Sequence, residues 1–246
     1  ERGASVYPLP RAVHFDDEAM RVFQSIGLAD AIGRDARVNV GTKFVDSNME
    51  LMLDWSRPQE VGPLGWHPSY RFHQPDLEAE LNRGIAARSN VTVKRSAEVS
   101  EVVDEGSLVR VSFTQDGEAQ SLSAHYVVGA DGARSVVRAT MQSDWEDLGF
   151  QERWLVIDVQ LTKPRPDLGD YTIQTCDRAR PTTYVRCPRD WRRWARWCSR
   201  RSSTCRSDSP TRGSTGGTPR APSCASSTGR RRRGRRWTAC SAACSS

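Results

Sequence analysis

A short stretch near the middle of the chain combines glycines, an acid, a hydroxyl and an arginine at spacings that suit phosphate binding. Its chemically informative positions are Gly129, Asp131, Gly132, Ser135 and Arg138. We expect a buried strand over residues 126–128 and a helix from about Ser135, so that glycines admit a ligand to the backbone and the helix N-terminus supplies N–H groups. These residues predict a site for an anionic diphosphate. An ordinary strand-to-helix turn, capped by Asp131, stays open as the alternative.

Other polar positions have simpler explanations when they are taken alone. Arg11 follows a proline and is compatible with an exposed charge, and Gln74 precedes Pro75 and is compatible with a helix cap. His14 and His73 are single histidines, for which packing or solvation is a simpler role than catalysis. Two neighbouring acids, Asp16 and Asp17, are expected to cap a helix. No residue is assigned as a catalytic acid or base.

The elements that must position these residues alternate between helix and strand. Apolar residues at three- and four-residue steps predict a helix from Asp16 or Asp17 to about Gly33, and a second helix begins near Pro75. A hairpin is expected over residues 44–54, within a segment 41–70. Further strands are expected over 91–94, 98–103, 108–114, 126–128, 154–161, 171–175 and 182–187, with a turn at Asp116-Gly117. This order predicts the α/β class with an appended strand-rich part.

Charge divides the chain sharply. Residues 191–246 contain 14 arginines and one acid, whereas residues 1–190 carry a net charge of −7. The overall charge of +6 therefore belongs to this tail, and a basic nucleic-acid-binding domain is not indicated. The chain has no run of 18 apolar residues and no charged-then-apolar leader, so we expect no membrane span, no secretion signal and a cytoplasmic enzyme.

The tail contains too few apolar side chains to offset the entropy of folding, and we expect residues 191–246 to be disordered. Its composition is typical of a GC-rich gene translated out of frame after about Trp194. The alternative is a nucleic-acid-binding arm that acts through the arginine run at 230–236. Five cysteines lie in the tail without the short paired spacing of zinc sites, so no metal site is predicted: Cys198, Cys205, Cys224, Cys240 and Cys244.

The full pattern Gly-Ala-Asp-Gly-x-x-Ser-x-x-Arg at 129–138 resembles a nucleotide-binding motif of the FAD-dependent aromatic hydroxylases of the p-hydroxybenzoate hydroxylase fold. Residues 7–20 and 72–78 resemble two further elements of that family, the latter as Gln-Pro-x-Leu-Glu. Within the family the likeness is greatest to the 3-(3-hydroxyphenyl)propionate hydroxylase group. Later segments at 153–159, 177–181 and 192–194 agree, and the resemblance covers about residues 1–194.

The resemblance implies an FAD-binding Rossmann-like three-layer domain with an inserted strand-rich substrate domain. It places a partial FAD-binding domain at 1–150, with the inserted hairpin at 41–70, and the start of a substrate-binding sheet at 151–190. The implied cofactor contacts are Glu1 with the ribose, Arg11 and Arg138 with the diphosphate region, Gln74 with the flavin, and the turn of Gly129, Asp131, Gly132 and Ser135.

Two family elements are absent from the sequence, the Gly-x-Gly-x-x-Gly turn and the later Gly-Asp-Ala-Ala-His-type element. In the family the ribose acid stands ten positions before the proline-associated arginine, as Glu1 does before Arg11. We therefore expect a chain that begins at the ribose acid, lacks the first βαβ unit, and is an inactive fragment that holds FAD weakly.

For the intact parent, the resemblance implies hydroxylation of a small phenolic aromatic substrate with FAD, NADH or NADPH, and O2. The cofactor supplies the redox chemistry, and the protein supplies orientation and a dry pocket. A flavin-dependent reductase or a polyketide-tailoring FAD oxygenase stays open as an alternative. The sequence indicates neither the individual substrate nor the oligomeric state.

Overall fold

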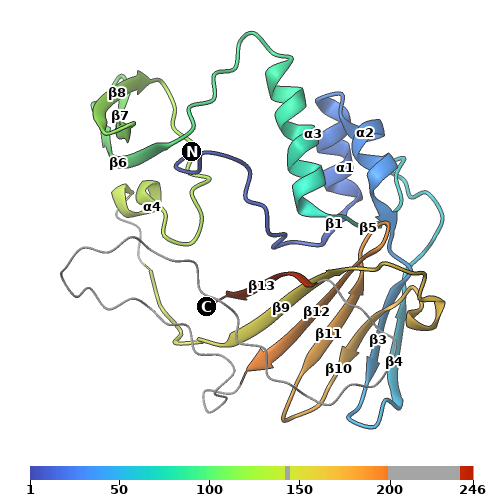
Figure 1. The fold of residues 1–246 in the computed structure, drawn as a ribbon. Coiled ribbons are helices and arrows are strands. Elements are labelled where there is room, and N and C mark those ends of the chain that lie inside the picture. Colours follow the sequence, from blue (N-terminus) through green and yellow to red (C-terminus); the bar gives the residue numbers. More distant parts are fainter. Residues whose placement is uncertain (142–144, 199–238, 246) are drawn as a thin grey trace. The chain divides into compact units, whose positions relative to one another are not determined.

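The computed structural model describes residues 1–141 and 145–198, together with the backbone of a strand at 239–245. The chain divides into two compact units (Figure 1). The first unit comprises residues 1–40 and 57–151, and the second comprises residues 41–56 and 152–246. The hairpin that interrupts the first unit in sequence thus belongs to the second unit.

The first helices form where local signals specify them. Helix α1 (Asp17–Ser25) follows strand β1 (His14–Asp16), and the Asp16 carboxylate caps it by accepting the Ala19 N–H. The predicted single helix to Gly33 is wrong, because Gly27 adopts φ +76° and ends α1. Its neighbour Leu28 donates its N–H back to the Phe23 carbonyl, which is the bond pattern of a Schellman cap. Helix α2 (Ala29–Asp35) then starts in a new direction.

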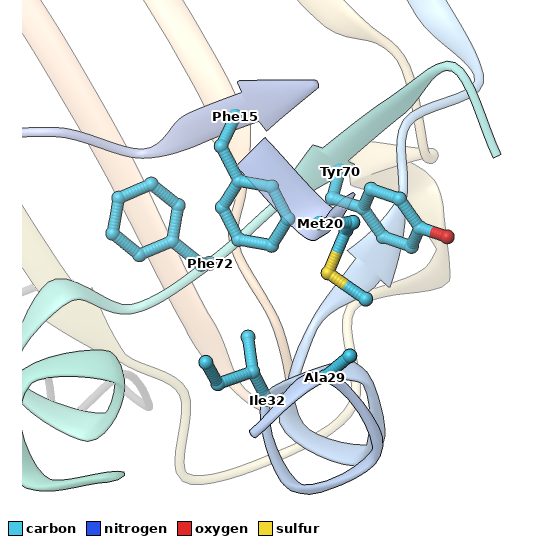
Figure 2. Close-up of a cluster of buried hydrophobic side chains, with 6 residues drawn as sticks. All are labelled: Phe15, Met20, Ala29, Ile32, Tyr70 and Phe72. Atoms are coloured by element: carbon cyan, nitrogen blue, oxygen red, sulfur yellow. The ribbon is translucent and has the colours of Figure 1, made fainter. Parts of the chain in front are cut away.

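The core of the first unit is a cluster of aromatic and aliphatic side chains at the start of the helices. The three helices, α1, α2 and α3 (Gln74–Ala86), stand beside a small antiparallel sheet of β1, β5 (Ser69–Arg71) and β2 (Arg37–Val38) (Figure 1). In this core cluster the fully buried Met20 lies among the rings of Phe15, Tyr70 and Phe72 (Figure 2). The ring of Phe15 lies 5.3 Å from that of Tyr70 and 5.2 Å from that of Phe72. Met20 is therefore a core residue, as its position in the helix predicts.

The rest of the first unit is an antiparallel three-stranded sheet and a short helix. Strands β6 (Ala97–Asp104), β7 (Val109–Gln115) and β8 (Glu118–Ala124) follow in order. Asp116 and Gly117, with φ of +52° and +86°, form the predicted two-residue turn between β7 and β8. Helix α4 (Val136–Thr140) contacts β6.

Two predicted strands of this region do not form. Residues 91–94 form no strand, and neither do residues 126–128. Tyr126 is 89% exposed and Val128 is 88% exposed, so the expectation of a buried strand is wrong. An apolar run becomes a strand only when a neighbouring strand accepts its backbone hydrogen bonds, and no described strand lies beside this one.

The second unit is one large sheet of strand order β13-β9-β12-β11-β10-β3-β4 (Figure 1). Every pairing is antiparallel except that of β10 with β3. The predicted hairpin is present as β3 and β4, and Asp46 closes its turn by accepting the N–H groups of Asn48 and Glu50. A short 3₁₀ turn, η1, precedes β10. The element bounds are β3 (Gly41–Val45), β4 (Leu51–Ser56), β9 (Arg153–Gln160), η1 (Pro166–Leu168), β10 (Thr172–Thr175), β11 (Thr182–Arg186), β12 (Trp191–Cys198) and β13 (Ala239–Ser245).

We predicted disorder from residue 191 onward, and this is wrong for residues 191–198, which form strand β12, and for the backbone of strand β13. Residues 199–238 lie outside the described part. Strand β12 is ordered although it is rich in arginine. The physical reason is a buried ion pair. Arg193 lies directly opposite Asp158 of β9. Its Nε donates to Oδ1 at 2.9 Å and its Nη2 donates to Oδ2 at 3.1 Å. Because a carboxylate neutralises it, this arginine can lie inside the sheet region at 6% side-chain exposure.

The architecture is therefore mixed α/β, as predicted. A parallel sheet of the Rossmann type is not present among the described strands. No described helix is long and apolar enough to cross a bilayer.

Candidate functional site

The predicted phosphate-binding turn is held together by its own acid. Asp131 accepts the Ser135 hydroxyl at 2.5 Å and the Val136 N–H at 2.7 Å, and the Val137 N–H at 3.3 Å. These hydrogen bonds, that of Ser135 first, lower the pKa of Asp131. Ser135 in turn caps α4 by accepting the Arg138 N–H at 2.9 Å. The expectation of free N–H groups at this helix end is thus wrong, because Asp131 and Ser135 use them.

Exposed backbone donors instead lie on the loop just before the helix. Gly132 has φ +79°, a conformation that favours glycine. The N–H groups of Gly132, Ala133 and Arg134 make no hydrogen bond within the described part of the chain, and all three residues are exposed. Successive N–H groups of this kind form a concave anion-binding arrangement. The loop therefore carries three exposed backbone donors just before the helix.

Two further contacts fix the shape of this turn. A Cβ on Gly129 would lie 2.7 Å from the Cβ of Val137, so only glycine allows this close approach of chain and helix. The guanidinium of Arg138 donates to the Ala133 carbonyl at 2.6 Å and lies 4.2 Å from the centre of the Trp145 ring. Arg138 is therefore held beside the loop that carries the exposed donors.

Gln74 and Arg11 are brought together across 63 residues of sequence. The Gln74 side-chain carbonyl accepts the N–H groups of Arg11 at 2.7 Å and Ala12 at 2.9 Å. Its amide group donates to Glu78 at 2.7 Å, which orients the side chain on α3. The Arg11 guanidinium lies 4.9 Å from the centre of the Tyr7 ring. Gln74 thus fixes the backbone that presents Arg11, and His73 rather than Gln74 is the N-cap residue of α3.

Glu1 lies on a separate part of the first unit. Its backbone carbonyl accepts the Ala97 N–H at the start of β6. Its carboxylate accepts the Gly3 N–H at 2.7 Å, and this hydrogen bond is the main cause of its lowered pKa. The hydrogen bonds described for Glu1, for the Arg11–Gln74 pair and for the 129–138 turn each lie within their own group. The structure therefore presents three separate groups of predicted cofactor residues.

The two histidines that the sequence singles out, His14 and His73, have local partners. His14 shares a hydrogen bond of 2.7 Å with the Ser69 hydroxyl, and Asn39 donates to the same hydroxyl at 2.8 Å. Burial lowers the pKa of His14, and the charges of Arg57 and Arg71 add to this effect. His73 lies 3.1 Å from Asp76. Among the described residues, no group of three or more His, Cys, Asp or Glu side chains is arranged to hold a metal ion.

Sequence reasoning missed one group of residues on the second unit's sheet. Tyr184 of β11 lies opposite Trp194 of β12, and their ring centres are 5.2 Å apart. Arg192 and Arg186 form the opposite pair two residues along and share this face. The alternation of Arg192, Trp194 and Arg196 was the available signal, but a segment rich in arginine was assigned to the tail.

Comparisons with known proteins show which family this chain is similar to. The family model described as "FAD binding domain" matches residues 1–212. A "Probable NADH-specific resorcinol 4-hydroxylase" of Rhodococcus jostii is 39% identical over 189 residues, which are 75% of this chain and 35% of that protein. A "3-(3-hydroxy-phenyl)propionate/3-hydroxycinnamic acid hydroxylase" of Burkholderia cenocepacia is 33% identical over 198 residues, or 79% of this chain and 35% of that protein. The chain thus spans about a third of the length of these relatives.

Solved structures show the same fold. The p-nitrophenol 4-monooxygenase of Pseudomonas putida superposes with a TM-score of 0.73 at 20% sequence identity, over 82% of this chain and 51% of that one. At this identity the likeness concerns the fold alone. The match of the family model over most of the chain goes further, and on that basis the chain belongs to the FAD binding domain family.

Proposed function

We propose that this chain is part of a flavoprotein monooxygenase that hydroxylates a phenolic aromatic substrate with FAD, NAD(P)H and O2. The family match over residues 1–212 carries this proposal, because a chain of this family uses FAD. The relatives named as resorcinol and 3-(3-hydroxyphenyl)propionate hydroxylases support phenols as the substrate class.

The residues present fit the proposed cofactor at its phosphates. Adjacent exposed N–H groups at Gly132, Ala133 and Arg134 match phosphate oxygens, and Arg138 is held beside them. We assign the anchoring of the diphosphate to this loop, with Asp131, Ser135 and Gly129 as the residues that fix its shape. FAD, when bound, supplies the electron transfer and the activation of oxygen.

The other predicted contacts keep their roles in the proposal. Gln74 holds the backbone at Arg11 in place, so that Arg11 is presented for the cofactor from a fixed chain. Glu1 is assigned to the adenosine ribose; the hydrogen bond from Gly3 keeps its carboxylate ionised, as an acceptor of hydroxyl groups requires. The sheet of the second unit is assigned to the substrate; the Tyr184 and Trp194 rings lie on it with their centres 5.2 Å apart.

This function is tested by titrating FAD with the full chain at equilibrium and measuring the quenching of flavin fluorescence. A titration measures a weak complex as well as a tight one. We expect binding, and we expect Arg138→Gln to weaken it about tenfold, since a charge-assisted hydrogen bond is lost. Arg21→Gln is the matched control, because Arg21 is an exposed arginine of α1 that only approaches Glu18 at 3.8 Å. Absence of flavin binding, or equal losses in both variants, contradicts the proposal.

A further inference from the structure

Arg11, one of the two arginines expected at the diphosphate region, is held at both ends. Its backbone N–H donates to the Gln74 side chain at 2.7 Å. Its guanidinium lies over the ring of Tyr7, 4.9 Å from the ring centre. A guanidinium at this distance is attracted by the negative face of an aromatic ring. Tyr7 is therefore a second anchor of Arg11, at the charged end of the side chain.

The chain between the two residues favours this contact. Residues 7–11 read Tyr-Pro-Leu-Pro-Arg. The proline rings at positions 8 and 10 each fix a backbone φ angle at about −65°, so the segment loses little backbone entropy when it is held in place. The rotamer entropy of the long Arg11 side chain remains to be offset. The ring of Tyr7 restrains that part of the residue.

A ring restrains a guanidinium without using its hydrogen-bond donors. In a stack of this kind the ring lies against the flat face of the guanidinium, whereas the five N–H groups point outward in its plane. A carboxylate in the same place would bind those N–H groups and neutralise the charge. An aromatic neighbour therefore suits an arginine that binds a phosphate. Tyr7 is 45% exposed, so a ligand in solution reaches this pair.

The second arginine expected at the diphosphate region has the same kind of neighbour. The Arg138 guanidinium lies 4.2 Å from the centre of the Trp145 ring, which belongs to a residue that is 69% exposed. Two arginines from distant parts of the sequence thus each lie against an exposed aromatic side chain. The contact between Tyr7 and Arg11 repeats an arrangement found at the 129–138 turn.

We propose that Tyr7 is a positioning residue for FAD binding, whose ring holds the Arg11 guanidinium in place for the diphosphate. This inference rests on the proposed function. Tyr7 acts through Arg11 and does not itself need to touch the cofactor. Because a cation–π contact at an exposed site is weak, its loss should change the affinity for FAD by about two- to fivefold.

The role of Tyr7 is tested by titrating FAD with the full chain and its variants and measuring the quenching of flavin fluorescence. We expect Tyr7→Leu to weaken binding about two- to fivefold, and Tyr7→Phe, which keeps the ring, to bind like the wild-type chain. In an Arg11→Gln background, Tyr7→Leu should have no further effect, because Tyr7 acts through the arginine. Tyr171→Leu is the matched control and should leave the affinity unchanged, since it removes a ring whose centre lies 4.4 Å from the Lys43 Nζ in the second unit.

A second measurement detects the contact in the absence of FAD. The ring current of an aromatic side chain shifts the NMR signals of groups over its face upfield. In a chain with labelled arginines, we expect an upfield-shifted side-chain signal of Arg11, identified by its absence from the spectrum of Arg11→Gln. Tyr7→Leu should abolish the shift, and Tyr7→Phe should retain it.

Several results would overturn the inference. They are an unchanged FAD affinity in Tyr7→Leu, an equal loss in Tyr7→Phe, an equal effect of Tyr7→Leu with and without Arg11, and an Arg11 signal that Tyr7→Leu leaves in place. Each of the first three requires a wild-type chain that binds FAD, so it contradicts the role of Tyr7 alone. A wild-type chain that does not bind FAD contradicts the proposed function and, with it, the cofactor role of Tyr7; the NMR signal then still decides whether the ring holds Arg11.

Discussion

Replacing Asp158 by asparagine should destabilise the second unit by about 3–5 kcal/mol, which is the usual cost of removing one partner of a buried ion pair. The Asp158 and Arg193 side chains are only 8% and 6% exposed, and two hydrogen bonds of 2.9 and 3.1 Å join them. Asparagine keeps the volume and one acceptor oxygen but removes the charge. Arg193 then remains buried without a counter-ion. Against a typical domain stability of about 5–15 kcal/mol, this loss is large.

Urea unfolding followed by tryptophan fluorescence measures the loss, because Trp194 and Trp197 lie on the same strand as Arg193. Asp54→Asn serves as the matched control. Asp54 pairs with Lys43 at 3.5 Å across neighbouring strands of the same sheet, but both side chains are more than one third exposed. We expect a change within about 1 kcal/mol there.

A cost for Asp158→Asn as small as that for Asp54→Asn would refute the reasoning, because the ion pair would then behave as a solvated one. A second variant separates charge from packing. Asp158→Leu combined with Arg193→Met replaces both charges by apolar groups, and it should recover most of the lost stability.

Three further predictions concern the first unit. Gly129→Ala should destabilise the turn and weaken FAD binding in the fluorescence titration, because its Cβ would lie 2.7 Å from that of Val137; unchanged affinity would show that the contact relaxes without cost. Gln74→Leu should lower the unfolding free energy by about 1–3 kcal/mol, since two N–H groups lose their acceptor, whereas Gln74→Glu, which keeps the acceptor, should cost less in the same denaturation experiment. Burial lowers the pKa of His14 in the folded state, so in mildly acidic solution the unfolded chain takes up a proton that the folded chain does not. The free energy of unfolding should therefore fall as the pH is lowered from about 6.5 toward the folded-state pKa. His14→Gln should remove this part of the pH dependence, which urea unfolding at several pH values measures.

Elements with local signals could be predicted from the sequence. The cap at Asp16, the Asp116-Gly117 turn and the proline at the start of α3 each act within a few residues, and all three are present. The strand expected at 126–128 depended on a neighbour that local sequence cannot supply. Strand β12 was missed for the opposite reason. Its arginines look like solvent-exposed residues, and only the pairing of Arg193 with Asp158, 35 positions away, shows that one of them is buried.

In the candidate site, too, the residues joined by local contacts could be predicted from the sequence, and those joined by long-range contacts could not. The 129–138 motif was visible because its hydrogen bonds run over four to six residues, from Ser135, Val136 and Val137 to Asp131. The hydrogen bond between the Gln74 side chain and the Arg11 backbone spans 63 residues and has no local signature, so it could not be predicted from the sequence. The loop donors before α4 depend on the backbone geometry at Gly132, which residue types alone do not specify.

The outer strand of the large sheet has a practical consequence for work with this chain. Strand β4 lies at the end of the strand order, and Leu51, Met52, Leu53 and Trp55 are 51–63% exposed along it. A hydrophobic strand at a sheet edge readily recruits strands from other molecules. We therefore expect concentrated samples to associate through β4, and we expect Leu53→Lys to keep them in solution.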